Sequence, residues 1–404
     1  MRARVSTFAE YRSWLVVEAA TGYGAATVAG KLFADLGCTV ARLVAPQSVP
    51  DDGIDSDREL DELVSRGKHS VAIDSTSPHA TAALDALLGA AEVLVADREG
   101  LLRLQAALHA ADLRWRYPAL TVCACTWFGM DGPLATWTGG EEIVQAVSGI
   151  MSITGHPGSG PTRVAGAPFT HAAAMLAVTS SLADVLRKKA GEKAGALDVS
   201  VYDTAIAFES ASLPVYFLTG TAPHGIGNRH SMSVPWNSFR CADGWVIVCA
   251  GNHPNWVRMC EMIGRPELVA DPRYATQEDR IAQVDGLEAE IVAWTRQRPV
   301  AEVEAQLVAG NIAGGSVLAL PDVLAHPQFR ARNLADAASG GRQAGGIFPL
   351  NREPLAVRQG AWRAGAGTRA ILMDRCGVSP ADYERWRASG ALGDENGVAY
   401  AAGA

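Results

Sequence analysis

The first 130 residues alternate short apolar runs with segments of helical periodicity, and this alternation constrains the fold more than any other feature of the chain. Apolar runs of strand length occur at 14–19, 39–44, 70–74, 92–97 and 119–129. Helical patterns separate most of these runs. Continuously apolar strands with helical connections predict a doubly wound α/β domain, in which helices cover both faces of a parallel sheet.

A smaller domain of a different kind is predicted after residue 220. The segment 221–235 breaks all periodicity, and 238–250 reads as a hairpin around Asp243-Gly244, a pair typical of a tight type I′ turn. Helical patterns follow as far as residue 309. We therefore expect three parts: a large α/β domain over 1–220, a small α+β domain over 225–330, and a return of 335–404 to the large domain.

The composition describes a large globular protein and excludes several partners. Its 404 residues are 48% hydrophobic and 19% charged, which excludes a disordered chain. The net charge of −8, without a basic and aromatic cluster, excludes nucleic acid as a partner. Because no run of about 18 apolar residues occurs, we expect a cytoplasmic protein that does not span a membrane. Seven cysteines without a CxxC pair predict neither a disulfide framework nor a metal site.

The first turn of the predicted sheet carries a weak phosphate-binding signal. GYGAAT at 22–27 is close to a dinucleotide fingerprint, with Thr27 in place of the third small residue. About 20 residues later, Arg42 stands where an NAD-binding protein needs an acid. A cation there suits a phosphorylated ribose, as in NADP or coenzyme A. The alternatives are a tight packing turn at 22–27 and a solvated charge at Arg42.

A second basic site follows the first helix–strand unit, and its residues are Ser65, Arg66, Gly67 and Lys68. Gly67 lets the backbone approach a ligand closely. We place this site with Arg42 and Arg103 at the carboxyl edge of the sheet, where such folds bind ligands. Together these residues favour a nucleotide-like anion, and a surface turn is the alternative for the second site.

These segments resemble the class III CoA-transferase family, which includes formyl-CoA and carnitine CoA-transferases and the 2-methylacyl-CoA racemases. The matching segments run in the family's order along nearly the whole chain: LFADLGCTVARLVAP at 32–46, SRGKHSVAID at 65–74, EVLVADREG at 92–100, WFGMDGP at 127–133, GGEEIVQAVSGIMSITGHPGSGPTRV at 139–164, DVSVYDTAI at 198–206, NSFRCADGWVIVCAGN at 237–252, WVRMCEMIGRPELVADPRYAT at 256–276 and LPDVLAHPQFRAR at 320–332.

The resemblance implies an enzyme that acts on acyl-CoA, with a free carboxylic acid as second substrate and no metal. It also implies a Rossmann-like large domain and two interlocked copies of the chain. By the same resemblance the coenzyme A site includes Arg42, Ser65 to Lys68, Asp97 and Arg103. Asp97 departs from the family, which has an asparagine at this position.

The main departure concerns the catalytic group. The family nucleophile is an aspartate in a P-x-x-D stretch that opens a helix, and it attacks the thioester to form an acyl-aspartyl anhydride. The matching stretch here, Pro168 to His171, ends in histidine. An imidazole attacks thioesters, but water removes the resulting acyl-imidazole quickly. The resemblance therefore implies non-standard transfer chemistry at His171.

Three alternatives stay open beside this transferase hypothesis. In the racemase branch a histidine and the P-x-x-D aspartate flank the α-carbon, and the matching residues here are Glu141 and His171, which could form a pair of bases. The alternative to this pair of bases is that Glu142 replaces a structural aspartate of the family and Glu141 is a solvated loop acid. His171, Glu141 and Glu142 are thus the candidate catalytic residues. The chain could also be a non-catalytic subunit of a heteromer with an Asp-bearing paralogue, and an NADP-dependent oxidoreductase is a more distant alternative.

Overall fold

The structure is a computed structural model that describes residues 13–45, 64–77, 79–193, 195–332, 334, 349–350, 353–354 and 364–393. The described residues form two compact units. The first unit gathers those within 13–150, 164–214 and 332–393, and the second gathers 151–163 and 215–331.

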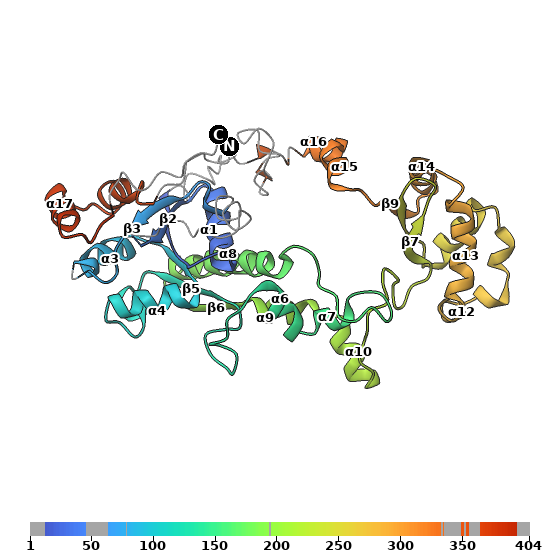
Figure 1. Cartoon of the computed structure of the whole chain (residues 1–404), viewed down its shortest axis with the longest axis horizontal. Coiled ribbons are helices and arrows are strands. Elements are labelled where there is room, and N and C mark those ends of the chain that lie inside the picture. The colour runs from blue at the N-terminus through green and yellow to red at the C-terminus, as the bar shows by residue number, and fades with distance from the viewer. Residues whose placement is uncertain are drawn as a thin grey trace. The chain divides into compact units, whose positions relative to one another are not determined.

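The first unit is built on a six-stranded sheet in which every neighbouring pair of strands is parallel (Figure 1). The strand order is β3-β2-β1-β4-β5-β6. The prediction of a doubly wound α/β domain is confirmed. The strands are β1 (Leu15–Ala19), β2 (Thr39–Val44), β3 (His69–Ala72), β4 (Val93–Ala96), β5 (Thr121–Thr126) and β6 (Ala196–Ser200).

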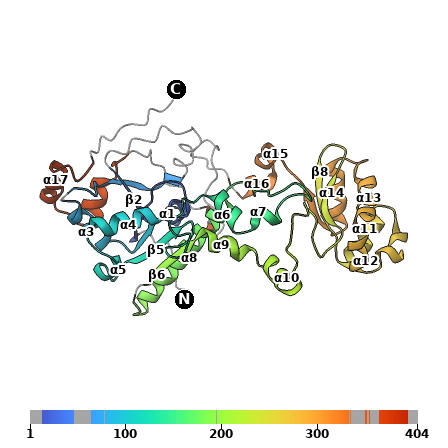
Figure 2. The ribbon, with the colours of Figure 1, turned by 60° about the horizontal axis from the view of Figure 1, so that its bottom comes forward.

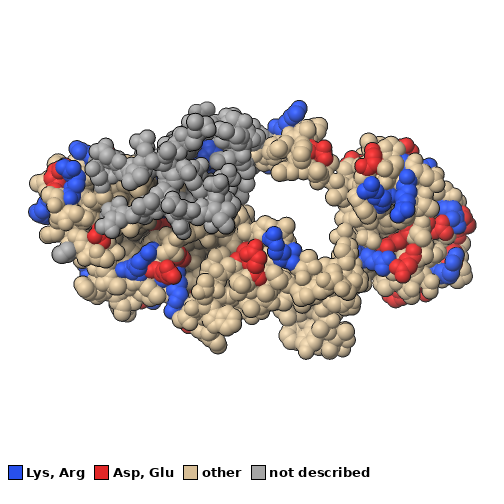
Figure 3. Space-filling view, viewed as in Figure 1, with Lys and Arg blue, Asp and Glu red and all other residues tan. Residues whose placement is uncertain are grey.

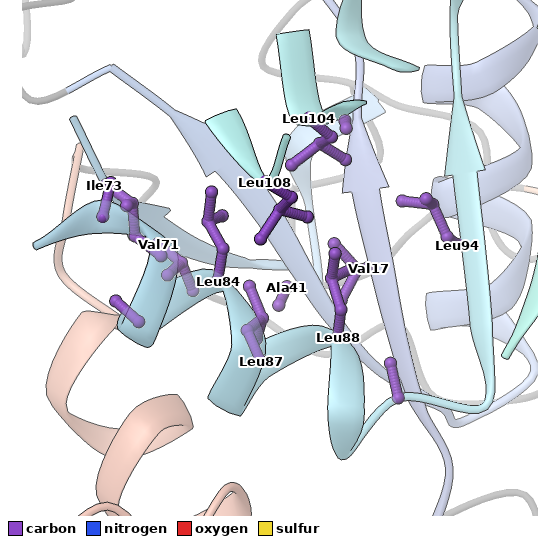
Figure 4. Packing of buried hydrophobic residues seen from close by; sticks show 14 of the residues in the cluster. Val17, Ala41, Val71, Ile73, Leu84, Leu87, Leu88, Leu94, Leu104 and Leu108 are labelled. Atoms are coloured by element: carbon purple, nitrogen blue, oxygen red, sulfur yellow. The ribbon is translucent and has the colours of Figure 1, made fainter. Parts of the chain in front are cut away.

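Helices cover both faces of this sheet because its strands are apolar on both faces. Val17 belongs to one hydrophobic core and its neighbour Val16 to the other. Figure 4 shows Leu84, Leu87 and Leu88 packed around Val17 in the first of these cores. The helices on that face are α3 (Ala80–Gly89), α4 (Arg98–Ala107) and α5 (Leu113–Arg116), and those on the other face are α1 (Ala25–Asp35), α8 (Pro168–Lys189) and α9 (Val201–Phe208).

The end of the described chain returns to this unit. Tyr383 and Trp386 of α17 (Pro380–Ala388) pack into the same core as α3, and Figures 1 and 2 both show α17 near α3. A π-helical segment, Ala370–Arg375, precedes α17. The remaining elements of this unit are α6 (Glu141–Val147) and the short strands β10 (Pro349–Leu350) and β11 (Glu353–Pro354).

Among the described residues, α8 is the one helix that is long and apolar enough to cross a membrane, by length and composition alone. Half of its most apolar window is buried within the protein. Ala173, Ala174 and Ala177 lie in the core shared with α1. The small side chains allow α8 to approach α1 closely, which is the pattern of a core helix.

The second unit contains a three-stranded antiparallel sheet in the order β7-β8-β9. The predicted hairpin is present as β7 (Trp236–Arg240) and β8 (Trp245–Cys249), whereas β9 (Ala313–Ser316) was not predicted. Its sequence is AGGS, which lacks an apolar run. Close packing requires the glycine at position 314, because a Cβ there would lie 2.6 Å from the carbonyl oxygen of Ile247.

Three helices share a hydrophobic core with this small sheet around Phe239, Trp256 and Leu287. They are α11 (His253–Met262), α13 (Val284–Thr295) and α14 (Val300–Ala309). Helix α12 (Gln277–Ala282) precedes α13, and its Arg280 donates to the carbonyl oxygen of Val234 at 3.1 Å. Figure 3 shows acidic and basic side chains interspersed on the visible surface of this unit. The other helices are α15 (Leu320–Ala325), α16 (Pro327–Ala331), the 3-10 turns Pro266–Val269 and Pro272–Tyr274, and two that lie where the units adjoin in sequence, α7 (Ile150–Ile153) and α10 (Ser212–Thr219).

Candidate active site

The strand order reverses direction between β1 and β4, and a pocket lies at the carboxyl ends of these two strands. The helix after β1 covers one face of the sheet and the helix after β4 covers the other, so a crevice opens between them. The cavity volume is about 320 Å³. Its walls come from three loops that are distant in sequence: 20–26 after β1, 97–102 after β4, and 125–139 around the end of β5.

Asp97 holds two of these loops together. One carboxylate oxygen accepts from the backbone N–H of Gly100 at 2.6 Å and so caps the N-terminus of α4. The other accepts from the backbone N–H and the hydroxyl of Thr21, at 2.6 and 2.7 Å. Asp97 therefore lines the pocket, as a predicted site residue should, but its contacts in the structure are those of a positioning residue.

Arg42, Ser65 and Lys68 were predicted to meet coenzyme A, and the structure buries all three around Glu18. The ammonium of Lys68 lies 2.5 Å from Glu18 Oε2 and donates to the carbonyl oxygen of Thr27 at 2.8 Å. Arg42 Nε lies 3.3 Å from Glu18 Oε1, and its guanidinium also donates to the hydroxyl of Ser65. Sequence reasoning missed Glu18, although a single acid inside the apolar run WLVVEA was a visible signal.

The position of this cluster corrects one expectation. Residues 65–68 precede β3, so they enter the parallel sheet at the beginning of a strand and do not lie at its carboxyl edge. Arg42 and Lys68 instead contact Glu18 on the face of the sheet that α1 covers. Helix α1 approaches Glu18 so closely that a Cβ on Gly30 would lie 1.8 Å from Glu18 Oε2. Gly67 has φ +77, a conformation that favours glycine, and Arg66 beside it is half-buried.

Arg103 lies apart from that cluster, on the face of the sheet that α4 covers. It lines a second, smaller pocket of about 90 Å³ at the ends of β2 and β3. Ala45, Ile73 and Ser75 are among the other lining residues. Arg103 is thus the predicted cation that does reach the carboxyl edge as an exposed side chain.

Glu141 is buried and caps the N-terminus of α8. Its Oε2 accepts from the backbone N–H and the hydroxyl of Thr170 at 2.9 and 2.6 Å, and its Oε1 accepts from the backbone N–H of Phe169 at 3.2 Å. Gln145 donates to the same Oε1 at 3.0 Å. The carboxylate therefore replaces the side-chain cap that Ala167 cannot provide.

This arrangement corrects the alternative in which Glu142 was structural and Glu141 a solvated loop acid. Glu141 is 7% exposed, whereas Glu142 is exposed on the surface of α6. The two residues are adjacent in a helix and therefore face different directions. The sequence contained the acid but could not show which of the two neighbours faces α8.

His171 lies in the first turn of α8 and is exposed. Its Nδ1 lies 2.9 Å from the carbonyl oxygen of Ala167. Because a carbonyl oxygen only accepts, Nδ1 carries the proton, and in the neutral ring Nε2 holds the lone pair. The imidazole therefore presents a base or nucleophile away from its own helix backbone.

Tyr23 connects His171 with the pocket, and sequence reasoning did not identify it. Its ring lines the pocket, and the ring centroids of Tyr23 and His171 are 6.4 Å apart. Burial, and then the negative charge of Glu141, raise the pKa of Tyr23 above its ordinary value. The phenol thus stays protonated at neutral pH and can donate a hydrogen bond beside His171.

A variant of Glu141 separates a capping role from a catalytic one. Each oxygen of Glu141 accepts hydrogen bonds, and in Glu141→Gln an NH2 group, which only donates, replaces one of these oxygens. We therefore expect the protein to lose about 1–2 kcal/mol of stability. We expect kcat with an acyl-CoA to stay within about tenfold of the parent value. A general base would instead account for about 10²–10⁴-fold. Urea denaturation and steady-state kinetics measure the two effects, and a larger fall in kcat with unchanged stability would contradict the capping role.

The described residues contain no group of three or more His, Cys, Asp and Glu side chains that could hold a metal ion. The groups that the structure shows at the site are the imidazole of His171, the phenol of Tyr23 and the N-terminus of α8. The fold defines the class of doubly wound α/β proteins, which bind their ligands in the crevice at the strand-order reversal, where this pocket lies.

Comparisons with known proteins agree with this class and specify it. The chain matches the CoA-transferase family III over residues 14–368, and it belongs to that family. It is 31% identical to the acetyl-CoA:oxalate CoA-transferase of Acetobacter aceti over 281 residues, which are 69% of this chain and 72% of the relative. It is 28% identical to the succinate–glutarate CoA-transferase of Agrobacterium fabrum over 352 residues, which are 82% of this chain and 85% of the relative.

Solved structures support the fold. The chain is similar to protein Rv3272 from Mycobacterium tuberculosis with a TM-score of 0.76 at 24% identity, covering 88% of this chain and 97% of that one. A CAIB/BAIF family protein from Brucella suis gives a TM-score of 0.73 at 24% identity, with 90% and 98% covered. The match to the family over residues 14–368 confirms the resemblance inferred from the sequence.

Proposed function

We propose that this protein acts on acyl-CoA thioesters and that His171 is the group that receives the acyl chain. The observation that carries the proposal is the hydrogen bond from His171 Nδ1 to the Ala167 carbonyl, 2.9 Å long. It orients the ring so that Nε2 presents its lone pair to solvent beside Tyr23 and the pocket. By the family resemblance, His171 occupies the position of the aspartate nucleophile.

Coenzyme A is the ligand that the surrounding charges favour. The cluster under α1 and its neighbours contain four cations and two acids, a formal charge of +2, and these residues are Lys31, Arg42, Arg66 and Lys68 with Glu18 and Asp35. A surplus of positive charge attracts phosphate groups even in an acidic protein. Arg103 adds a guanidinium at the carboxyl edge, and guanidinium groups bind phosphate through paired hydrogen bonds.

The proposed reaction begins when Nε2 attacks the thioester carbonyl carbon. The C–S bond breaks and coenzyme A leaves as a thiolate, so the acyl group is joined to the imidazole, which keeps its Nδ1 proton. A carboxylate acceptor then attacks the acyl carbon and expels the neutral imidazole, forming an anhydride. The thiolate attacks the acceptor's carbonyl carbon, which yields the new thioester and releases the first acid. With water as acceptor, the products are a free acid and coenzyme A.

The structure gives less support to the two-base racemase alternative. Both oxygens of Glu141 accept hydrogen bonds from the first turn of α8 or from Gln145. A carboxylate engaged in this cap of α8 would have to give up a hydrogen bond to reach a substrate proton. The capping role therefore disfavours Glu141 as the second base for α-proton transfer.

The test incubates the purified protein with a panel of acyl-CoAs in D2O, with and without free carboxylic acids, and follows the products by mass spectrometry. We expect loss of the thioester that depends on the protein, with a new acyl-CoA when an acid is present and free acid when it is absent. Deuterium at the α-carbon without acyl transfer would support the racemase alternative. Binding of coenzyme A without turnover would support the non-catalytic subunit, and neither binding nor turnover would overturn the proposal.

We further propose that two copies of the chain associate, as the family resemblance implies. Helix α10 has no buried residue, and Phe217 and Leu218 are 78% and 86% exposed. Figure 3 shows this helix as a surface without acidic or basic side chains. An apolar surface of this kind is typical of a protein–protein interface. The proposed partner that covers it is a second copy of this chain. An Asp-bearing paralogue is the alternative partner.

Charged residues on α10 should separate the two copies. We expect light scattering to give about twice the 42.4 kDa chain mass for the parent protein. The double variant Phe217→Asp/Leu218→Asp should shift the mass to that of one chain, because two buried carboxylates would have no partners. Trp115→Asp, at an 86% exposed position on α5, serves as the control. A parent protein that is monomeric at micromolar concentration would contradict the homodimer.

A further inference from the structure

We infer that the pocket beside His171 selects an uncharged, aromatic acyl group and rejects a dicarboxylic one. The inference rests on the proposed function, since it names the substrate class of the same site. It is argued from the aromatic walls of the pocket, from the charges that line it, and from its connection to His171.

Four aromatic side chains line the pocket: Tyr23, Trp127, Phe128 and Trp137. Trp137 is 54% exposed, so much of its ring is uncovered in the structure. The Phe128 ring supports it from one edge, with centroids 6.3 Å apart and an interplanar angle of 79°. Phe128 in turn contacts Tyr202 at 6.1 Å. A fixed and partly uncovered indole is a stacking surface for a flat ring, which would gain both apolar burial and ring–ring attraction.

The charged residues of the pocket disfavour a second carboxylate on the substrate. Of the described lining residues, Asp97 and Glu99 are acids and Arg98 is the single cation. Arg98 donates to the carbonyl oxygen of Met130 at 2.9 Å, which directs its guanidinium to the protein backbone. Two acids against one base leave a formal charge of −1 on the lining. A dicarboxylic acyl group would bring a further negative charge to a lining that already repels it.

The pocket has the size and position for an acyl group. Its volume of about 320 Å³ lies at the lower end of the range for small-molecule sites. Tyr23 belongs to both parts of the site, since it lines the pocket and its ring lies 6.4 Å from the His171 ring. Tyr23 therefore joins the pocket to the surroundings of His171, where an acyl group bonded to Nε2 would begin.

The test compares kcat/KM for four thioesters: benzoyl-CoA, 3-phenylpropionyl-CoA, hexanoyl-CoA and succinyl-CoA. We expect the better of the two aromatic thioesters to exceed hexanoyl-CoA by at least about tenfold and succinyl-CoA by more. Turnover that is fastest with succinyl-CoA or hexanoyl-CoA would overturn the inference while leaving the proposed function intact. Turnover of another acyl-CoA with none of these four would also overturn the inference, whereas neither binding nor turnover of any acyl-CoA would show that the proposed function itself has failed.

Variants of the pocket assign the preference to its walls. Trp137→Ala should lower kcat/KM for the aromatic thioesters at least about tenfold and leave hexanoyl-CoA within about threefold. Trp115→Ala removes an exposed tryptophan outside the pocket and should change neither. Glu99→Gln should raise the ratio of kcat/KM for succinyl-CoA to kcat/KM for the aromatic thioesters about threefold. Equal losses for all acyl groups in Trp137→Ala would contradict a selective role.

Discussion

His171→Ala is expected to lower kcat with acyl-CoA substrates by at least about 10³-fold, because the variant removes the atom that attacks the thioester. Binding of coenzyme A should be preserved, because Arg42 and Lys68 are held by their ion pairs with Glu18, and His171 bonds to the Ala167 carbonyl at the start of its own helix. Stopped assays for free thiol measure turnover, and calorimetry with coenzyme A measures binding. Activity that survives the substitution would contradict a nucleophilic imidazole.

Two further variants make this result specific. His79→Ala removes an exposed imidazole at the start of α3, on the other face of the sheet, and should leave kcat unchanged. His171→Asp places a carboxylate at the position where the family has its nucleophile. We expect this variant to transfer acyl groups to carboxylic acids and to hydrolyse less thioester than the parent, because an anhydride exchanges acids directly. If His171→Asp only hydrolyses the thioester, then the residues around position 171, and not the side chain at 171, decide between acyl transfer and hydrolysis.

Glu18→Gln is expected to cost about 3–5 kcal/mol of stability. The side chain of Glu18 is fully buried, and it is the carboxylate that faces both Lys68 and Arg42. A neutral amide of the same shape leaves two buried cations without that counter-charge. Urea denaturation followed by circular dichroism measures the change, and a loss below about 1 kcal/mol would contradict this role of Glu18.

Two comparisons show whether the charge imbalance causes the loss. In the double variant Glu18→Gln/Lys68→Met one of the two cations is also removed, so we expect at least half of the lost stability to return. Glu192→Gln breaks the exposed ion pair with Arg187, whose side chains are 53% and 55% exposed, and should change stability by less than about 1 kcal/mol. A double variant less stable than Glu18→Gln would show that Lys68 stabilises the fold by its other contact, with Thr27.

Much of the fold could be predicted because each element of the first unit carries its own local pattern. The run TVARLV at 39–44 corresponds residue for residue to β2, and the five predicted strands all occur. The strand β9 could not be predicted, since AGGS has neither apolar alternation nor β-branched residues. The position of β9 depends on its contact with Ile247 of β8, and a local pattern of four residues carries no information about a contact with a distant strand.

The site was predicted less completely, for a similar reason. Local patterns and family resemblance identified Asp97, Glu141 and His171 as site residues, and the structure places all three around the same end of the sheet and α8. They did not indicate that Glu141 caps α8 or that Tyr23 lies beside His171. Both facts depend on side-chain direction, which is set when separate elements pack.

The sequence by itself determined the α/β fold of the first unit, the hairpin of the second and the family, because these depend on apolar periodicity and on motifs that recur in order. Only the tertiary structure decided how the charges are used. It placed Arg42 and Lys68 around Glu18 and left Arg103 at the carboxyl edge. The physical reason is that a buried charge must be paired. Which residue pairs with it depends on the register of the strands and on how closely α1 approaches the sheet, and both are long-range properties of the folded chain.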